Sequence, residues 1–232
     1  MIKSIPIEKI LFLDIETVPQ AELWTDLSET EQKLWDKKTR FQRKEDTEAE
    51  EFYKERAGIM AEFGKIICIS IGKLEKNDKL FIKSFYGDDE KQLLEEFGEI
   101  FNRPKLRDVI LCAHNGKEFD FPYIARRMLI NGLQPPVPFR MFGKKPWEIP
   151  HLDTMELWKF GDWKSFVSLE LLAHLFQIPT PKDDIDGSMV SSIYHIEKDL
   201  PRIVRYCEKD VLTLANVFRR MRQEDLLQRR ED

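Results

Sequence analysis

Acidic side chains occur at three separated places in the sequence where packing alone would not put them. Asp14 and Glu16 stand at the end of an apolar run, Asp120 follows a second apolar run, and Asp210 lies within a helical pattern near the end of the chain. An unpaired charge in an apolar interior costs several kcal/mol, so such groups need a cation. Carboxylates without accompanying His or Cys pairs suit Mg²⁺ or Mn²⁺ rather than zinc.

The first pair of acids follows a predicted central strand. Ile7 to Ile15 form an almost unbroken apolar run, typical of a strand covered on both faces, and Pro19 ends it. Because side chains alternate along a strand, Asp14 and Glu16 project to the same face and could bind one ion together. The alternative is that they are ordinary acids at the end of a strand.

The other two acids belong to predicted helices. Asp120 stands just before a helix that starts near Pro122, where it could equally act as a helix cap. At about 100° per residue, Asp210 falls about 20° from Ile203 on the apolar face of the last helix. Tyr206 lies one turn earlier on that face. Core packing explains Tyr206 but leaves Asp210 as a buried charge.

The elements that must position these residues indicate an α/β fold. Residues 65–74 and 79–86 predict a β-hairpin, and 109–113 and 151–153 predict two further strands. Helical patterns cover 88–101, 121–131, 154–160, 169–176 and 200–221, whereas the proline-rich stretch 134–150 predicts a loop. We therefore expect a mixed sheet flanked by helices, in one domain spanning 1–232 with a charged helical insertion at about 21–63.

Three motifs in this chain resemble those of the DEDD superfamily of 3′-5′ exonucleases, also called DnaQ-like exonucleases. They are Asp14-x-Glu16, Asn115-x-x-x-Phe119-Asp120 and Tyr206-x-x-x-Asp210. The tyrosine four residues before the last aspartate matches the tyrosine subgroup, and Arg205 stands where the histidine subgroup has histidine. The surrounding phrases are most similar to bacterial proteins related to the proofreading domain of family B DNA polymerases. No polymerase domain accompanies the motifs.

The resemblance implies a ribonuclease H-like fold and hydrolysis of phosphodiester bonds at a 3′ end with two divalent ions, Mg²⁺ or Mn²⁺. By this analogy Asp14 bridges both ions, Glu16 and Asp210 complete the first, and Asp120 helps to hold the second. Tyr206 assists the attacking water. The implied substrate is DNA, as single strands or frayed ends, and the implied products are nucleoside monophosphates. RNA trimming, or an inactive binding module on the same fold, stays open.

Composition limits the class of protein. The chain has 42% hydrophobic and 34% charged residues, which predicts a folded globule, and a net charge of -5 argues against coating nucleic acid by bulk electrostatics. Acids interrupt the N-terminal sequence before any long apolar stretch, so we expect a cytoplasmic protein without a membrane segment. Cys68, Cys112 and Cys207 are predicted to be reduced core residues with no metal role.

Basic residues among aromatics are candidates for contacts with a single strand. Arg140, Lys144 and Lys145 lie near Phe139, Phe142 and Trp147, and a second basic run covers 37–44. Asn115 and Phe119, inside the second motif, are further candidates for substrate binding. Other polar residues are predicted to be structural: Asp153 as a helix cap, residues 183–186 as a solvated turn, and four isolated histidines, His114, His151, His174 and His195.

Overall fold

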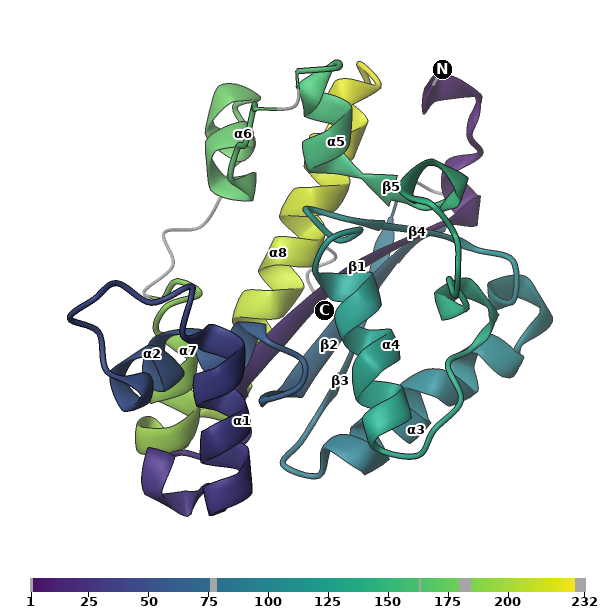
Figure 1. The fold of residues 1–232 in the computed structure, drawn as a ribbon. Coiled ribbons are helices and arrows are strands. Elements are labelled where there is room, and N and C mark those ends of the chain that lie inside the picture. Colours follow the sequence, from purple (N-terminus) through teal and green to yellow (C-terminus); the bar gives the residue numbers. More distant parts are fainter. Residues whose placement is uncertain (1, 76–78, 163, 180–184, 228–232) are drawn as a thin grey trace.

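The computed structural model describes residues 2–75, 79–162, 164–179 and 185–227. Its centre is a five-stranded mixed sheet with the strand order β3-β2-β1-β4-β5 (Figure 1). β2 (Gly64–Leu74) runs antiparallel to both β1 (Ile10–Pro19) and β3 (Leu80–Tyr86), whereas β4 (Ile110–Ala113) and β5 (Leu152–Asp153) run parallel to β1. This arrangement confirms the predicted combination of an antiparallel hairpin with parallel strands.

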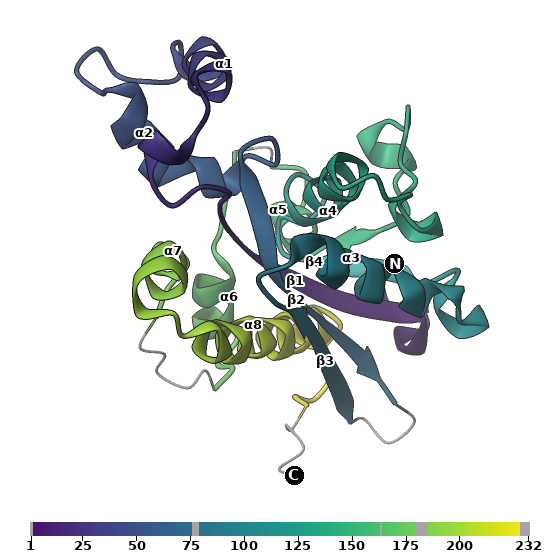
Figure 2. The ribbon, with the colours of Figure 1, turned by 90° about the horizontal axis from the view of Figure 1, so that it is seen from below.

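Helices cover both faces of the sheet (Figure 2). α3 (Glu90–Glu99) and α4 (Asp120–Ile130) pack on one face, and α8 (Leu200–Met221) crosses the other. α5 (Thr154–Lys159) and α6 (Leu169–Leu175) lie beside α8, and α7 (Val190–Ser192) continues into a π-helical turn, Ile193–Glu197. No described helix is long and apolar enough to span a bilayer.

Short 3-10 helices fill many of the connections between these elements. They cover Ile2–Ser4, Ile7–Lys9, Trp24–Asp26, Ala57–Ile59, Ile100–Asn102, Pro104–Leu106, Val137–Phe139 and Pro146–Glu148. Two of them are the only regular structure in 134–150, so the loop predicted there is confirmed.

The two faces of β1 explain where its acids point. Leu11, Leu13 and Ile15 belong to the core beneath α3 and α4, whereas Ile10 and Phe12 pack against the apolar stripe of α8. Since side chains alternate along a strand, Asp14 and Glu16 continue the Ile10 and Phe12 series. Both carboxylates therefore lie on the face that α8 covers.

Some predicted boundaries were wrong. β1 begins at Ile10 rather than Ile7, because β4 pairs with it only from Ile10 and β2 only from Phe12, so residues 7–9 have no partner strand and form a 3-10 turn. The pairing of β1 with β2 has a bulge between Glu16 and Thr17 and then continues to Pro19. α7 and its π-helical turn were not predicted. Residues 183 and 184 of the predicted acidic turn lie outside the described residues.

The region 21–63 contains α1 (Glu29–Thr39) and α2 (Ala49–Arg56), which pack on a small apolar core around Trp35 and Tyr53, both 0% exposed. The region lies between the end of β1 and the start of β2. Two side chains of α4 hold its final segment: the Tyr123 hydroxyl donates to the carbonyl of Gly58 at 2.7 Å, and Arg127 donates to the carbonyl of Ala61 at 2.9 Å. The helical region is thus connected to the helix that begins with Asp120.

The close approach of α8 to the sheet depends on Gly72, so we expect Gly72→Ala to destabilise the fold. A methyl group there would lie 2.6 Å from Cγ1 of Val211, the residue after Asp210. Overpacking of this kind should lower the free energy of unfolding by about 1 to 3 kcal/mol, measured by urea denaturation. Gly87→Ala is the matched control, because nothing lies within 4 Å of its added methyl group. Equal stabilities of the two variants would contradict this account of the packing.

Candidate active site

The site forms where β1 runs on past the end of its neighbour β4. The two strands pair only as far as Phe12 and Cys112, so the edge of β1 is open beside Asp14 and Glu16. α4 starts at this opening. Its first residue, Asp120, is 4% exposed and hydrogen-bonds to the backbone of Ile15. A carboxylate from the α4 side of the sheet therefore reaches the acids on the α8 side.

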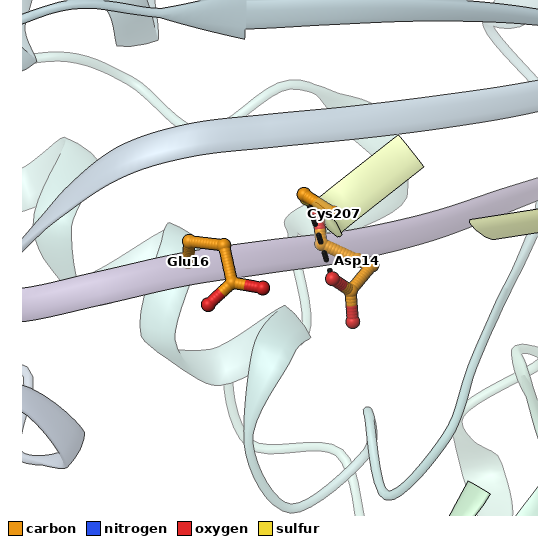
Figure 3. Close-up of side chains that lie close together, drawn as sticks. All are labelled: Asp14, Glu16 and Cys207. Carbon is orange, nitrogen blue, oxygen red and sulfur yellow. Dashed lines mark hydrogen bonds between the residues drawn. The ribbon is translucent and has the colours of Figure 1, made fainter. Parts of the chain in front are cut away.

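Asp14 and Glu16 point to the same side of β1, and Cys207 of α8 reaches Asp14 (Figure 3). One carboxylate oxygen of each acid and the sulfur of Cys207 all lie within 4.8 Å of one another. The thiol donates to Oδ2 of Asp14 over 3.3 Å. Three groups that can bind a metal ion thus come from two elements that are distant in the sequence.

α8 adds Asp210 and Tyr206 to this group. The negative charge of Asp210 acts on both Asp14 and Glu16, and the Tyr206 hydroxyl hydrogen-bonds to Asp210. All four predicted carboxylates and the predicted tyrosine therefore lie close enough to interact electrostatically. The structure thus brings together the acids and the tyrosine of the three motifs.

Burial and mutual repulsion oppose ionisation of the site. Burial, followed by the charges of Glu16, Asp210 and Asp120, raises the pKa of Asp14 well above its usual value. Burial and then the charge of Asp210 do the same for Glu16. Burial raises the pKa of Asp120 to about 7, against the opposing effect of its backbone hydrogen bonds. A divalent cation would remove this repulsion, and the oxygen-rich donor set fits one.

Asp153 orders the segment that leads to Asp120. Its carboxylate caps α5 by accepting from the backbone N–H of Met155 at 2.9 Å, which confirms the predicted cap. It also accepts from the backbone N–H groups of Asn115 at 2.9 Å and Lys117 at 3.1 Å. Asn115 has a φ of 60°, so this carboxylate stabilises a left-handed turn immediately after β4.

Histidines near the site are bonded to the protein itself. His114 contacts the hydroxyl of Thr154 and the carbonyl of Val167, each at 2.8 Å. His151 accepts from the backbone N–H of Leu111 and contacts the carbonyl of Pro138. Burial lowers the pKa of both rings. These contacts confirm the structural role predicted for His114 and His151.

The predicted substrate-binding residues lie in two different places. Asn115 and Phe119 are half-buried in the segment before Asp120, and the Phe119 ring packs 5.2 Å from that of Tyr123. Arg140, Lys144 and Lys145 are exposed in the loop before β5. Because β4 and β5 are parallel, the loop that leads into β5 enters at the end of the sheet where these strands begin. Asn115 and Phe119 follow the opposite end, where β4 finishes. No described contact joins its three basic residues to the carboxylates, and their contact with substrate stays a prediction.

The contact between Cys207 and the carboxylate of Asp14 was not predicted from the sequence. The prediction that this cysteine is a buried core residue is confirmed, since it is 0% exposed and packs with Cys68 and Val204. Its sulfur contacts a carboxylate because α8 crosses β1 at Asp14. The available signal was its position between Tyr206 and Asp210, on a helix face already assigned to the site.

Comparison with known families agrees with this geometry. A family model described as "Predicted 3'-5' exonuclease related to the exonuclease domain of PolB" matches residues 59–229, about three quarters of the chain. The chain belongs to this family. It is therefore an enzyme of the 3′-5′ exonuclease class. The matched range contains Asp120, Tyr206 and Asp210, whereas Asp14 and Glu16 precede it. No curated protein sequence gives a significant match.

Solved structures support the fold. The family B DNA polymerase from the hyperthermophilic archaeon Pyrobaculum calidifontis aligns with a TM-score of 0.53 and 14% identity, over 88% of this chain and 23% of the polymerase. The chain thus spans about a quarter of that protein. A looser alignment, with a TM-score of 0.41 and 10% identity, joins 90% of this chain to 41% of the zinc-bound E. coli ExoI in its complex with single-stranded DNA. The predicted ribonuclease H-like fold is confirmed.

The burial of Asp120 predicts that Asp120→Asn stabilises the metal-free protein. A buried acid whose pKa rises from 3.8 to about 7 binds its proton more tightly in the folded state, so the wild type loses stability as the pH rises through this window. At pH 8 the variant should gain up to about 4 kcal/mol, at about 1.4 kcal/mol per pKa unit, and less at pH 5. Thermal melting in excess chelator measures this difference.

The exposed acid Asp108 provides the control for this experiment. Asp108→Asn should leave the pH dependence of the melting temperature unchanged. A clear loss of stability in metal-free Asp120→Asn at pH 8 would instead give Asp120 a structural role.

Proposed function

We propose that this chain, as one domain with α1 and α2 forming an insertion, is a metal-dependent 3′-5′ exonuclease of the tyrosine subgroup. Its substrate would be the 3′ end of single-stranded or frayed DNA, and its products nucleoside monophosphates. The supporting observation is that four acids from three separate segments meet at one opening in the sheet, where burial and the charges of neighbouring acids raise the pKa of Asp14 and Glu16. Charge gathered in this way needs a cation to be stable.

The carboxylates of Asp14, Glu16, Asp120 and Asp210 would hold two Mg²⁺ or Mn²⁺ ions, with Asp14 shared between them. Such ions make bound water nucleophilic at neutral pH and stabilise the leaving oxygen. The protein contributes by keeping the carboxylates in place. The backbone of Ile15 holds Asp120, and the Cys207 thiol holds Asp14.

Tyr206 is suited to orienting a water molecule rather than to removing its proton. Burial, followed by the charges of Asp210, Glu16 and Asp14, raises the pKa of the phenol far above its usual value of 10. A phenol held in this neutral form donates a hydrogen bond and cannot act as a general base at neutral pH. Its hydroxyl, at Asp210, would align the attacking water.

DNA is the proposed substrate because the family is related to the exonuclease domain of a DNA polymerase. The competing substrate, RNA, differs by the 2′-hydroxyl group, which a pocket at the terminal sugar would have to accept. Purified protein with Mg²⁺ or Mn²⁺ should shorten 3′-end-labelled and 5′-end-labelled single-stranded DNA in the pattern of 3′-5′ cleavage. Faster shortening of RNA of the same sequence would identify RNA, rather than DNA, as the substrate. Absence of cleavage of both nucleic acids would contradict the proposal.

Loss of a single ligand should remove nearly all of this activity. We expect Asp14→Ala and Asp210→Ala each to reduce turnover to near background, because each change removes a ligand of an ion that the reaction needs. Excess chelator should do the same to the wild-type protein. The exposed acid variant Asp108→Asn should keep full turnover. Full activity in excess chelator, or in both alanine variants, would contradict the proposed metal site.

Removing only the hydroxyl of Tyr206 should have a graded effect. Tyr206→Phe keeps the ring and its packing, so the melting temperature should hold, while turnover at saturating metal and substrate falls about 10- to 10³-fold. This loss should be smaller than that of Asp14→Ala. Tyr86→Phe, at a tyrosine that is 54% exposed on β3, is the control. Wild-type turnover in Tyr206→Phe would leave the residue with a packing role alone.

A further inference from the structure

A cysteine faces the metal-binding acids. Cys207 is 0% exposed, and its sulfur lies 3.3 Å from Oδ2 of Asp14 and 3.5 Å from the carbonyl oxygen of the same residue. Its sulfur and one carboxylate oxygen from each of Asp14 and Glu16 lie within 4.8 Å of one another (Figure 3). A single divalent metal ion could therefore contact all three atoms.

Glu16 provides an independent sign that this position takes a ligand. The residue is 8% exposed, and among the described residues no hydrogen bond or ion pair is made by its carboxylate. Buried carboxylates without partners are costly, and structures keep them where a cation completes the site. Figure 3 shows the Glu16 and Asp14 carboxylates on the same side of β1, with Cys207 beside Asp14.

A chain of hydrogen-bonded polar groups lies on the β2 side of Cys207, opposite to its contact with Asp14. Cys68, opposite Glu16 on β2, hydrogen-bonds to Cys207, and its sulfur lies 3.7 Å from the hydroxyl of Ser70. Ser70 contacts Ser84 at 2.8 Å, and Ser84 donates to Glu208 at 2.9 Å. Because Ser84 donates to Glu208, the protons of this chain point from Cys68 toward Glu208, and the hydrogen bond with Cys68 favours the neutral thiol of Cys207.

We propose that Cys207 is a metal-facing thiol which binds soft divalent ions, such as Zn²⁺ or Cd²⁺, and makes the enzyme sensitive to them. This inference rests on the proposed function of the site. Thiolates prefer soft ions, whereas Mg²⁺ prefers oxygen ligands. With Mg²⁺ the thiol keeps its proton and remains the hydrogen-bond donor to Asp14. With a soft ion the sulfur–hydrogen bond breaks, the proton leaves to solvent, and sulfur binds the ion without any change in oxidation state.

The test is to add Cd²⁺ to metal-stripped protein and record the ultraviolet absorption of a cadmium–thiolate bond. The chain has three cysteines, so two complementary variants isolate the one of interest. Wild type and the variant C68S/C112S, which retains only Cys207, should show the band. Cys207→Ser should not. Competition calorimetry should show that Cys207→Ser loses Cd²⁺ affinity about 10- to 100-fold relative to its Mn²⁺ affinity, the range found for altered metal sites.

Three outcomes would overturn this inference: no band in wild type, no band in folded C68S/C112S, or a band that persists in Cys207→Ser. Circular dichroism establishes that each variant is folded. Cleavage of labelled DNA with Mn²⁺, measured on the same wild-type preparation, separates the two proposals. Cleavage without a band overturns only the role of Cys207. A band that follows Cys207, without cleavage, supports the metal-binding thiol and overturns the proposed exonuclease function.

Discussion

Electrostatic repulsion among buried carboxylates is the constraint on which the rest of the structure depends. Asp14, Glu16 and Asp120 each have a raised pKa because the fold withdraws them from water and places them near like charges. A protein that gathers acids in this way gives up stability in its metal-free form. It therefore needs a rigid surrounding framework and a cation that binds the folded state in preference to the unfolded one.

That framework consists of α8 on one face of the sheet and α4 on the other. Both helices reach the carboxylates beside the part of β1 that β4 does not pair with. α8 approaches β2 and β1 closely because Gly72 has no side chain, and α4 is fixed at its start by Ile15 and along its length by Arg127. Arg127 also forms a buried ion pair with Glu90 of α3. Pairing leaves the guanidinium with its hydrogen bonds satisfied, so α4 keeps its position without exposing a charge to the core. The acids stay in place although they repel one another.

Local pattern was enough to predict most elements. The last helix was predicted at 200–221 and is observed at Leu200–Met221, because one unbroken stripe from Ile203 to Phe218 fixes both its period and its buried face. The start of β1 was misplaced because apolar residues at 7–10 look like strand, and only the absence of a partner strand before Ile10 excludes it. Residues 190–197 carry no strong period, so the short helix and π-helical turn there were not foreseen.

The motifs were enough to predict the acids and the tyrosine of the candidate site. Contacts that depend on how two elements cross in space could not be predicted from the sequence. Asp210 could be assigned from its angle on the helix. The contact of Cys207 with Asp14 could not, because it depends on where α8 crosses β1. The position of the loop with Lys144 and Lys145 relative to the site likewise required the direction of β5.

The strand order also has a consequence for folding kinetics. β1 lies at the middle of the sheet, yet its partners β2 and β4 begin at Gly64 and Ile110, and the helix that covers its acids begins only at Leu200. Contacts between residues far apart in sequence form slowly, and a chain that folds during synthesis exposes the apolar β1 until those partners emerge. The helix that carries Asp210 is the last described helix of the chain. Incomplete chains therefore lack part of the proposed nuclease site, and assembly of that site marks a late step in folding.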